Sequence, residues 1–78
     1  MTFTQFKTAQ ELGSLMLGEA RKSNKCPNLQ SVVVHAAGHP GDWDYNCGWS
    51  GPLRPPACEL ELLDIKVRLK KQGFGLKT

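Results

Sequence analysis

The sequence predicts a small α+β domain in which a β-hairpin lies between two helices. Apolar residues recur at helical spacing near the N-terminus, two β-rich stretches with a turn between them follow, and the last segment places its acids before its bases. The chain has 78 residues, of which 40% are hydrophobic and 22% charged. This length suits one folded domain over residues 1–78 and excludes larger architectures.

The first helix is predicted within residues 3–24. Its apolar side chains fall on one face and its charged and polar side chains lie largely opposite, as in an amphipathic helix. Two pairs of residues fit the spacing of a capping box at its start, Thr2 with Gln5 and Thr8 with Glu11. The helix should end at Asn24, because asparagine can adopt the left-handed conformation and Pro27 cannot continue a helix.

A β-hairpin is predicted next, from strands over residues 29–37 and 43–49. The first strand is rich in β-branched residues and ends at the turn 38–42, and the second alternates large apolar with polar residues. Because the loop is short, the strands should form a two-stranded antiparallel sheet. Val32–Val34 is apolar on both faces, so we expect a second copy of the chain to extend or cover this sheet.

The segment 57–72 follows a proline-rich connector, residues 50–56, and fits two structures. Apolar and charged residues alternate over 63–70, which is compatible with a strand. We predict a helix, because its acids precede its bases as the helix dipole favours and Gly73 provides a stop signal. As a helix it carries two apolar stripes, one of Leu60, Leu63 and Val67, the other of Leu62, Ile65 and Leu69.

One of these stripes should pack on the hairpin, and the other would need the first helix or a second copy to cover it. The predicted core combines the aromatic face of the second strand with residues of both helices. Its members are Trp43, Tyr45, Trp49, Leu12, Met16, Phe6, Leu63 and Val67.

The order of these elements resembles that of small uncharacterised bacterial proteins with an α-β-β-α arrangement. The stretches that carry the resemblance are Thr2–Lys7, Val32–Val34, Asp42–Asp44, Pro56–Cys58 and Gly73–Leu76. They span nearly the whole chain and consist of packing and turn residues. The resemblance implies the fold and no activity.

Cysteine and histidine residues supply the ligand types of a zinc site, but their spacing does not fit one. The candidates are Cys26, His35, His39, Cys47 and Cys58. Structural zinc sites take closely spaced ligand pairs, whereas these residues are scattered, so we expect neither metal nor cofactor.

An odd number of cysteines without a Cys-x-x-Cys pair predicts reduced thiols in a cytoplasmic protein. No signal-peptide pattern or membrane-spanning apolar stretch is visible, so we expect no membrane contact.

No set of residues fits the active site of an enzyme. Asp42 and Asp44 point to the same side of their strand, but no other acid lies nearby and so short a chain offers no deep pocket. A Cys47 nucleophile with His35 or His39 as its base would need an exposed thiol, whereas alternation places Cys47 on the buried aromatic face. The sequence therefore predicts a non-enzymatic protein.

We expect a protein-interaction module that acts as a homodimer or with a partner protein through the outer face of the hairpin. The predicted contact residues are Val33, His35, Asp44 and Asn46. The alternative is a weak nucleic-acid-binding protein that uses the basic last helix. The net charge is +3 and five of the ten basic residues follow residue 65. That site would consist of Lys66, Arg68, Lys70 and Lys71.

Overall fold

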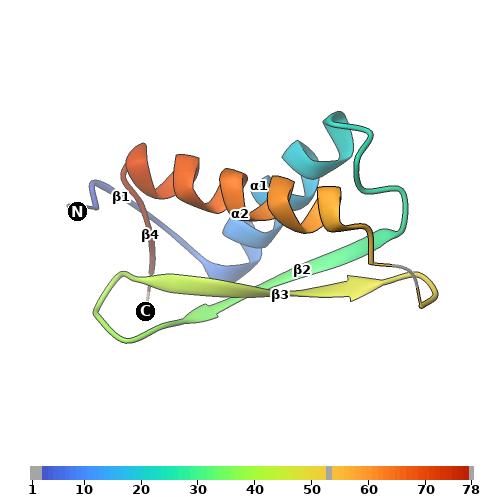
Figure 1. Cartoon of the computed structure of the whole chain (residues 1–78). Coiled ribbons are helices and arrows are strands. Elements are labelled where there is room, and N and C mark those ends of the chain that lie inside the picture. Colours follow the sequence, from blue (N-terminus) through green and yellow to red (C-terminus); the bar gives the residue numbers. More distant parts are fainter. Residues whose placement is uncertain (1–2, 53, 78) are drawn as a thin grey trace.

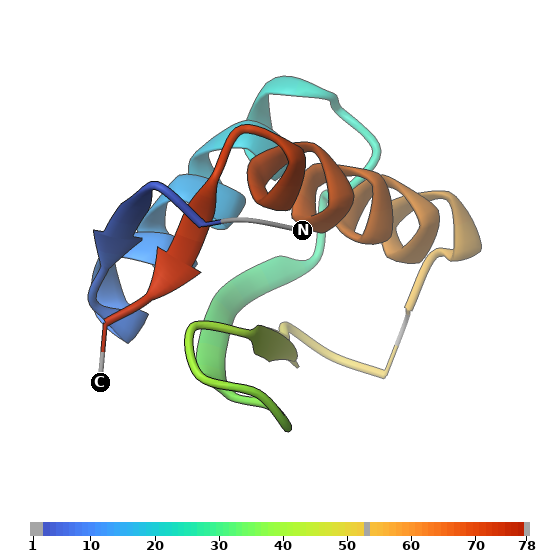
Figure 2. The same cartoon turned by 90° about the vertical axis from the view of Figure 1, so that its left-hand side faces the viewer.

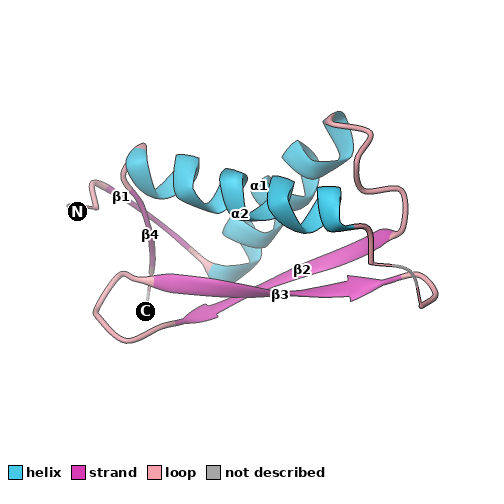
Figure 3. Ribbon diagram, in the orientation of Figure 1, coloured by secondary structure: helices cyan, strands magenta, loops and turns pink. Residues whose placement is uncertain are grey.

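The computed structural model describes residues 3–52 and 54–77, which form two helices and four strands. In chain order these are β1 (Gln5–Lys7), α1 (Ala9–Lys22), β2 (Leu29–Ala36), β3 (Trp43–Trp49), α2 (Pro56–Lys71) and β4 (Phe74–Leu76) (Figure 3). β2 and β3 form an antiparallel sheet, and β1 and β4 form a separate parallel pair. The fold is therefore of the predicted α+β class. Within the described ranges, no helix is both long and apolar enough to cross a membrane.

Both helices lie on one face of the β2–β3 sheet, which leaves the other face uncovered (Figure 1). The hairpin prediction is confirmed, because the register places Val34 opposite Tyr45 and Val33 opposite Asn46. Successive residues of a strand point to opposite faces. Val34 and Tyr45 therefore face the helices, whereas Val33 and Asn46 lie on the outer face.

A capping box at Thr8 fixes the start of α1. The Thr8 hydroxyl accepts the N–H of Glu11, and the Glu11 carboxylate accepts the N–H of Thr8, both at 3.1 Å. The alternative start at Thr2, which lies outside the described residues, is wrong because Gln5–Lys7 is a strand. At the other end, Asn24 adopts a φ of 60°, which confirms the predicted left-handed residue after the helix.

The segment predicted as helix rather than strand is indeed a helix. α2 carries Glu59 in its first turn and three basic residues in its last. The chain leaves the helix through Gly73, whose φ of 93° is a left-handed conformation that favours glycine. Both features on which the prediction relied, the charge order and the glycine stop, are therefore present.

The parallel pair of β1 and β4 is absent from the predicted helix–hairpin–helix order, which needs this correction. Gln5 lies opposite Phe74 and Lys7 opposite Leu76, so the two ends of the described chain run side by side (Figure 2). The N–H of Leu76 donates to the carbonyl oxygen of Gly41 at 2.8 Å, which ties β4 to the hairpin turn. Strands of three residues are too short to show a hydrophobic period, so the sequence contains no local signal for them.

The core lies between the two helices and the inner face of the sheet. Trp43, Leu12 and Met16 are fully buried, as predicted. Tyr45 and Trp49 are half-buried and pack against this core. The inner face of β3 is therefore covered most completely at its start.

Three predicted core residues are wrong, since Phe6, Leu63 and Val67 are 54%, 46% and 39% exposed. α2 turns its other stripe inward, which comprises Cys58, Leu62, Ile65 and Leu69. The two stripes are similarly apolar, so periodicity alone could not choose between them. Phe6 belongs to β1 rather than to α1 and lies beside the hairpin turn at Gly41.

A disulfide joins Cys26 to Cys58, which corrects the expectation of reduced thiols for these two residues. Cys26 follows α1, Cys58 lies in the first turn of α2, and their Cα atoms are 4.8 Å apart. Both cysteines are buried. The pair is separated by 32 residues, so the bridge depends on how the two helices meet and leaves no spacing pattern in the sequence. Cys47 retains a free thiol.

Candidate functional site

The outer face of the hairpin holds the four residues predicted as a contact surface. The register places Val33 opposite Asn46 and His35 opposite Asp44, so the structure brings them together. Val33 is 60% exposed, and His35 and Asn46 are exposed as well. Since Val33 is the one aliphatic residue among the four, this surface is polar and offers little apolar area to a docking partner.

Asp42 immediately precedes β3 and binds the first residue of that strand at the free edge of the sheet. Its Oδ1 accepts the N–H of Trp43 at 2.9 Å and lies 2.6 Å from Nζ of Lys70, which reaches down from α2. The Lys70 ammonium also lies 5.3 Å from the centre of the Trp43 indole ring. The hydrogen bond from Lys70, followed by that from the Trp43 N–H, lowers the pKa of Asp42.

Asp44 repeats this arrangement two residues further along β3. Its Oδ1 accepts the N–H of Tyr45 at 2.8 Å and lies 3.5 Å from Nζ of Lys66. The Tyr45 N–H is the largest cause of the lowered pKa of Asp44, and the charge of Lys66 adds to it. The two aspartates thus satisfy outward N–H groups of an edge strand, which opposes pairing with another strand.

The basic residues predicted to bind nucleic acid do not form one free surface. Lys66 and Lys70 bind Asp44 and Asp42, and their side chains are only 19% and 17% exposed. Arg68 lies 3.2 Å from Asp64, one turn earlier on the same helix, and Lys71 is exposed. Three of the four cations therefore lie next to a carboxylate, and a phosphate backbone would not meet a stripe of four free charges.

The candidate metal ligands and nucleophiles are dispersed over the fold. The disulfide removes Cys26 and Cys58 as ligands. Cys47 lies on the helix-facing side of the sheet and His35 on the outer side, so the two cannot act together. Burial, with a smaller effect of the Glu59 charge, raises the pKa of the Cys47 thiol, which is the opposite of activation. Over residues 3–52 and 54–77, no group of three or more His, Cys, Asp or Glu side chains is placed to hold a metal ion.

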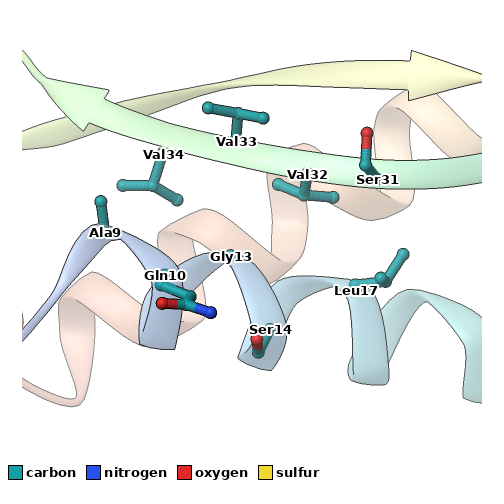
Figure 4. Close-up of a pocket in the computed structure, with 9 residues that line it drawn as sticks. All are labelled: Ala9, Gln10, Gly13, Ser14, Leu17, Ser31, Val32, Val33 and Val34. Carbon is teal, nitrogen blue, oxygen red and sulfur yellow. The ribbon is translucent and has the colours of Figure 1, made fainter.

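An open groove between α1 and β2 was not anticipated from the sequence. It has a volume of about 370 Å³ and is lined by Ala9, Gln10, Gly13, Ser14, Leu17 and Ser31–Val34. Val32 and Val34 are directed from β2 towards α1 (Figure 4). The two elements touch at Gly13, where a Cβ atom would lie 2.5 Å from the carbonyl oxygen of Val32. This contact places α1 against the free edge of β2, which also opposes strand pairing there.

The outward stripe of α2 consists of Leu60, Leu63 and Val67. These side chains are 69%, 46% and 39% exposed, and they are three of the six large hydrophobic residues exposed in the described part of the chain. The helical pattern of the sequence predicts this stripe, but the predicted core wrongly includes two of its members, Leu63 and Val67. Cys58 is buried, so it lies on the side of α2 that faces the core. Its disulfide partner is 32 residues away, so the sequence contains no local pattern that identifies this side.

No protein-family model, no curated protein and no solved structure matches this chain. The resemblance to bacterial α-β-β-α proteins stays a prediction, and the function is inferred from the surfaces alone.

Proposed function

We propose that this protein is a non-enzymatic interaction module, acting as a homodimer or with a partner protein, and that the outward stripe of α2 is its docking surface. The supporting observation is the exposure of Leu60, Leu63 and Val67 on one helix face, at 69%, 46% and 39%. An exposed apolar patch with a polar rim is typical of a protein interface.

The other surfaces support docking less well. The outer face of the hairpin presents Val33 among polar side chains. The edge of β2 lies against α1 at Gly13, and Asp42 and Asp44 occupy the edge of β3. We therefore place the docking surface on α2 rather than on the outer hairpin face or a sheet edge.

Nucleic-acid binding is the less favoured alternative, because Lys66 and Lys70 are engaged with aspartates.

The sequence predicts a cytoplasmic location, but the disulfide makes that location less favoured. The Cys26–Cys58 disulfide supports an oxidising compartment, since cytosolic thiols are normally kept reduced.

The test of this proposal is affinity purification of the tagged protein from the cells that naturally produce it, with nuclease treatment of the lysate. The compared forms are wild type, Leu63→Glu on the outward stripe, and Val33→Glu as the matched control on the outer hairpin face. We expect wild type and Val33→Glu to recover the same protein, whether another protein or an untagged copy, and Leu63→Glu to lose it. Unchanged recovery by folded Leu63→Glu, or recovery of nucleic acid alone, would refute the proposal.

A further inference from the structure

We infer that the Cys26–Cys58 disulfide makes docking through α2 depend on the redox state of the chain, because it holds the end of the outward stripe that carries Leu60. This inference rests on the proposed function, since it describes the regulation of the same surface. In the oxidised chain all three residues of the stripe lie on one helix face. In the reduced chain we expect the start of α2, residues 56–61, to unwind, so that Leu60 no longer belongs to the stripe.

The start of α2 has little support of its own. Pro55 stands at the cap position, and no side chain there accepts a hydrogen bond from the first turn. That turn is closed by backbone hydrogen bonds, in which the N–H groups of Cys58 and Glu59 donate to the carbonyl oxygen of Pro55 at 3.0 and 3.2 Å. Uncapped helix ends fray at low cost in free energy, so contacts with the rest of the fold decide whether these residues stay helical.

A groove lies between the start of α2 and the end of β3, where a packed interface would otherwise hold the helix. Its volume is about 410 Å³, and its lining includes Glu59 and Leu62 of α2 with Cys47 and Trp49 of β3. Cys47 and Trp49 are only half-buried. The start of α2 therefore gains little stability from packing on β3.

In the described part of the chain, two links join the start of α2 to the segment that follows α1. One is the disulfide, and the other is the Lys25–Glu61 ion pair, in which Nζ lies 3.5 Å from Oε2. The Lys25 side chain is 56% exposed, so water screens the pair. After reduction, Cys58 is held only as a small buried apolar side chain, and this burial competes with the entropy that residues 56–61 gain on unwinding.

The later turns of α2 are held independently of the disulfide. Ile65 and Leu69 are buried in the core. Lys66 and Lys70 bind the two aspartates at the edge of β3, at 3.5 and 2.6 Å. Reduction should therefore unwind the start of α2 without releasing these turns, and it should shorten the outward stripe rather than abolish it.

Reduction by a small dithiol is a balanced exchange. One thiolate of the dithiol attacks Sγ of Cys26, which is the more accessible residue because it is 6% exposed and Cys58 is 0% exposed. The S–S bond breaks, and Sγ of Cys58 leaves with the electron pair and takes up the proton that the attacking thiol had lost. The second thiol of the reductant then attacks the mixed disulfide, which releases Cys26 as a thiol and leaves the dithiol oxidised to a disulfide.

The test is NMR spectroscopy of the full chain, oxidised and after reduction with dithiothreitol, with Cα chemical shifts as the measure of helical structure. We expect the shifts of residues 57–61 to lose more than about half of their helical displacement on reduction, whereas those of residues 65–71 lose less than about a tenth. The double change Cys26→Ala with Cys58→Ala should show the same pattern without reductant. Cys47→Ser is the control and should respond to the reductant as wild type does. Unchanged shifts at residues 57–61, or an equal loss over all of α2, would overturn the inference.

A second measurement connects the unwinding to docking and separates it from the proposed function. In the affinity purification, carried out without reductant, we expect the double variant to recover at least about threefold less of the partner protein than oxidised wild type does. Equal recovery would overturn the redox dependence of docking. Full recovery by oxidised Leu63→Glu would overturn the proposed function instead, whereas the NMR result for residues 57–61 would be unaffected.

Discussion

Gly13 is the residue at which α1 touches the edge of β2. A Cβ atom there would lie 2.5 Å from a backbone oxygen of Val32, which cannot move without shifting the strand. We predict that Gly13→Ala lowers the free energy of unfolding by about 1–3 kcal/mol, although alanine is the better helix former by about 1 kcal/mol. Urea denaturation measures the change.

Gly18 provides the matched control in the same helix. Apart from its chain neighbours and the backbone of its own helix, no atom of the described residues lies within 4 Å of a Cβ built there, so helix propensity alone should act. Gly18→Ala should raise the free energy of unfolding by about 0.5–1 kcal/mol. If both variants are stabilised, the close approach of α1 to β2 is not present in solution.

Asp42 makes the stability of the hairpin edge depend on pH. Its pKa lies below the ordinary value of 3.8, so its contribution is present above that value and is lost as pH falls through the lowered pKa. The side chain is 34% exposed, so solvent screens the contribution. We predict that Asp42→Asn lowers the free energy of unfolding at pH 7 by only about 0.5–1 kcal/mol.

The difference between Asp42→Asn and wild type should shrink between pH 7 and an acidic pH below 3.8, because the wild-type carboxyl group takes up a proton as the pH falls through its lowered pKa. Chemical denaturation at both pH values measures this. Glu19→Gln, at an exposed ion pair with Lys22 in α1, is the control and should change stability by less than about 0.5 kcal/mol. A deficit for Asp42→Asn that is equal at both pH values would show that the carboxylate charge does not contribute.

At the scale of elements, the helices and the hairpin could be predicted because their signals are local. Thr8 and Glu11 form a capping box and are only three residues apart. Asn24 and Gly73 end their helices by adopting a left-handed conformation directly after the last turn. The face that α2 presents to the core could not be predicted in this way. Its two stripes are similarly apolar, and the choice between them depends on contacts with α1 and β3, far away in the sequence.

The Cys26–Cys58 disulfide holds the start of α2 to the end of α1, where α2 has no side-chain cap. It closes a loop with a sequence separation of 32 residues. We predict that reduction, or the double change Cys26→Ala with Cys58→Ala, lowers the free energy of unfolding by about 3–4 kcal/mol. Denaturation with and without a reductant measures this.

Cys47→Ser is the control for the disulfide, since Cys47 lies outside the bridge and is half-buried. The reductant should destabilise this variant as much as it destabilises wild type. The oxidised wild-type chain should also show one reactive thiol after unfolding. Three reactive thiols would mean that the disulfide is not formed.

In the molecule as a whole, the strands β1 and β4 near the two ends of the described chain pair with each other, and the sequence does not predict this pairing. β1 and β4 pair across nearly the full length of the chain, and β4 is hydrogen-bonded to the hairpin turn at Gly41. The candidate site likewise could be predicted only in part from the sequence. The outward stripe was visible as a helical pattern, but its exposure follows from the packing of the other stripe, which includes Cys58 and Leu62.

The most direct test of the central claim, that the outward stripe of α2 is the docking surface, is in its homodimer form a dilution series of amide NMR spectra. The chain of 78 residues is small enough for every signal to be followed. We expect the amide signals of Leu60, Leu63 and Val67 to move with concentration up to about 1 mM, while those of Val33 and Asn46 stay fixed. Movement confined to the outer hairpin face, or no movement at all, would contradict the claim.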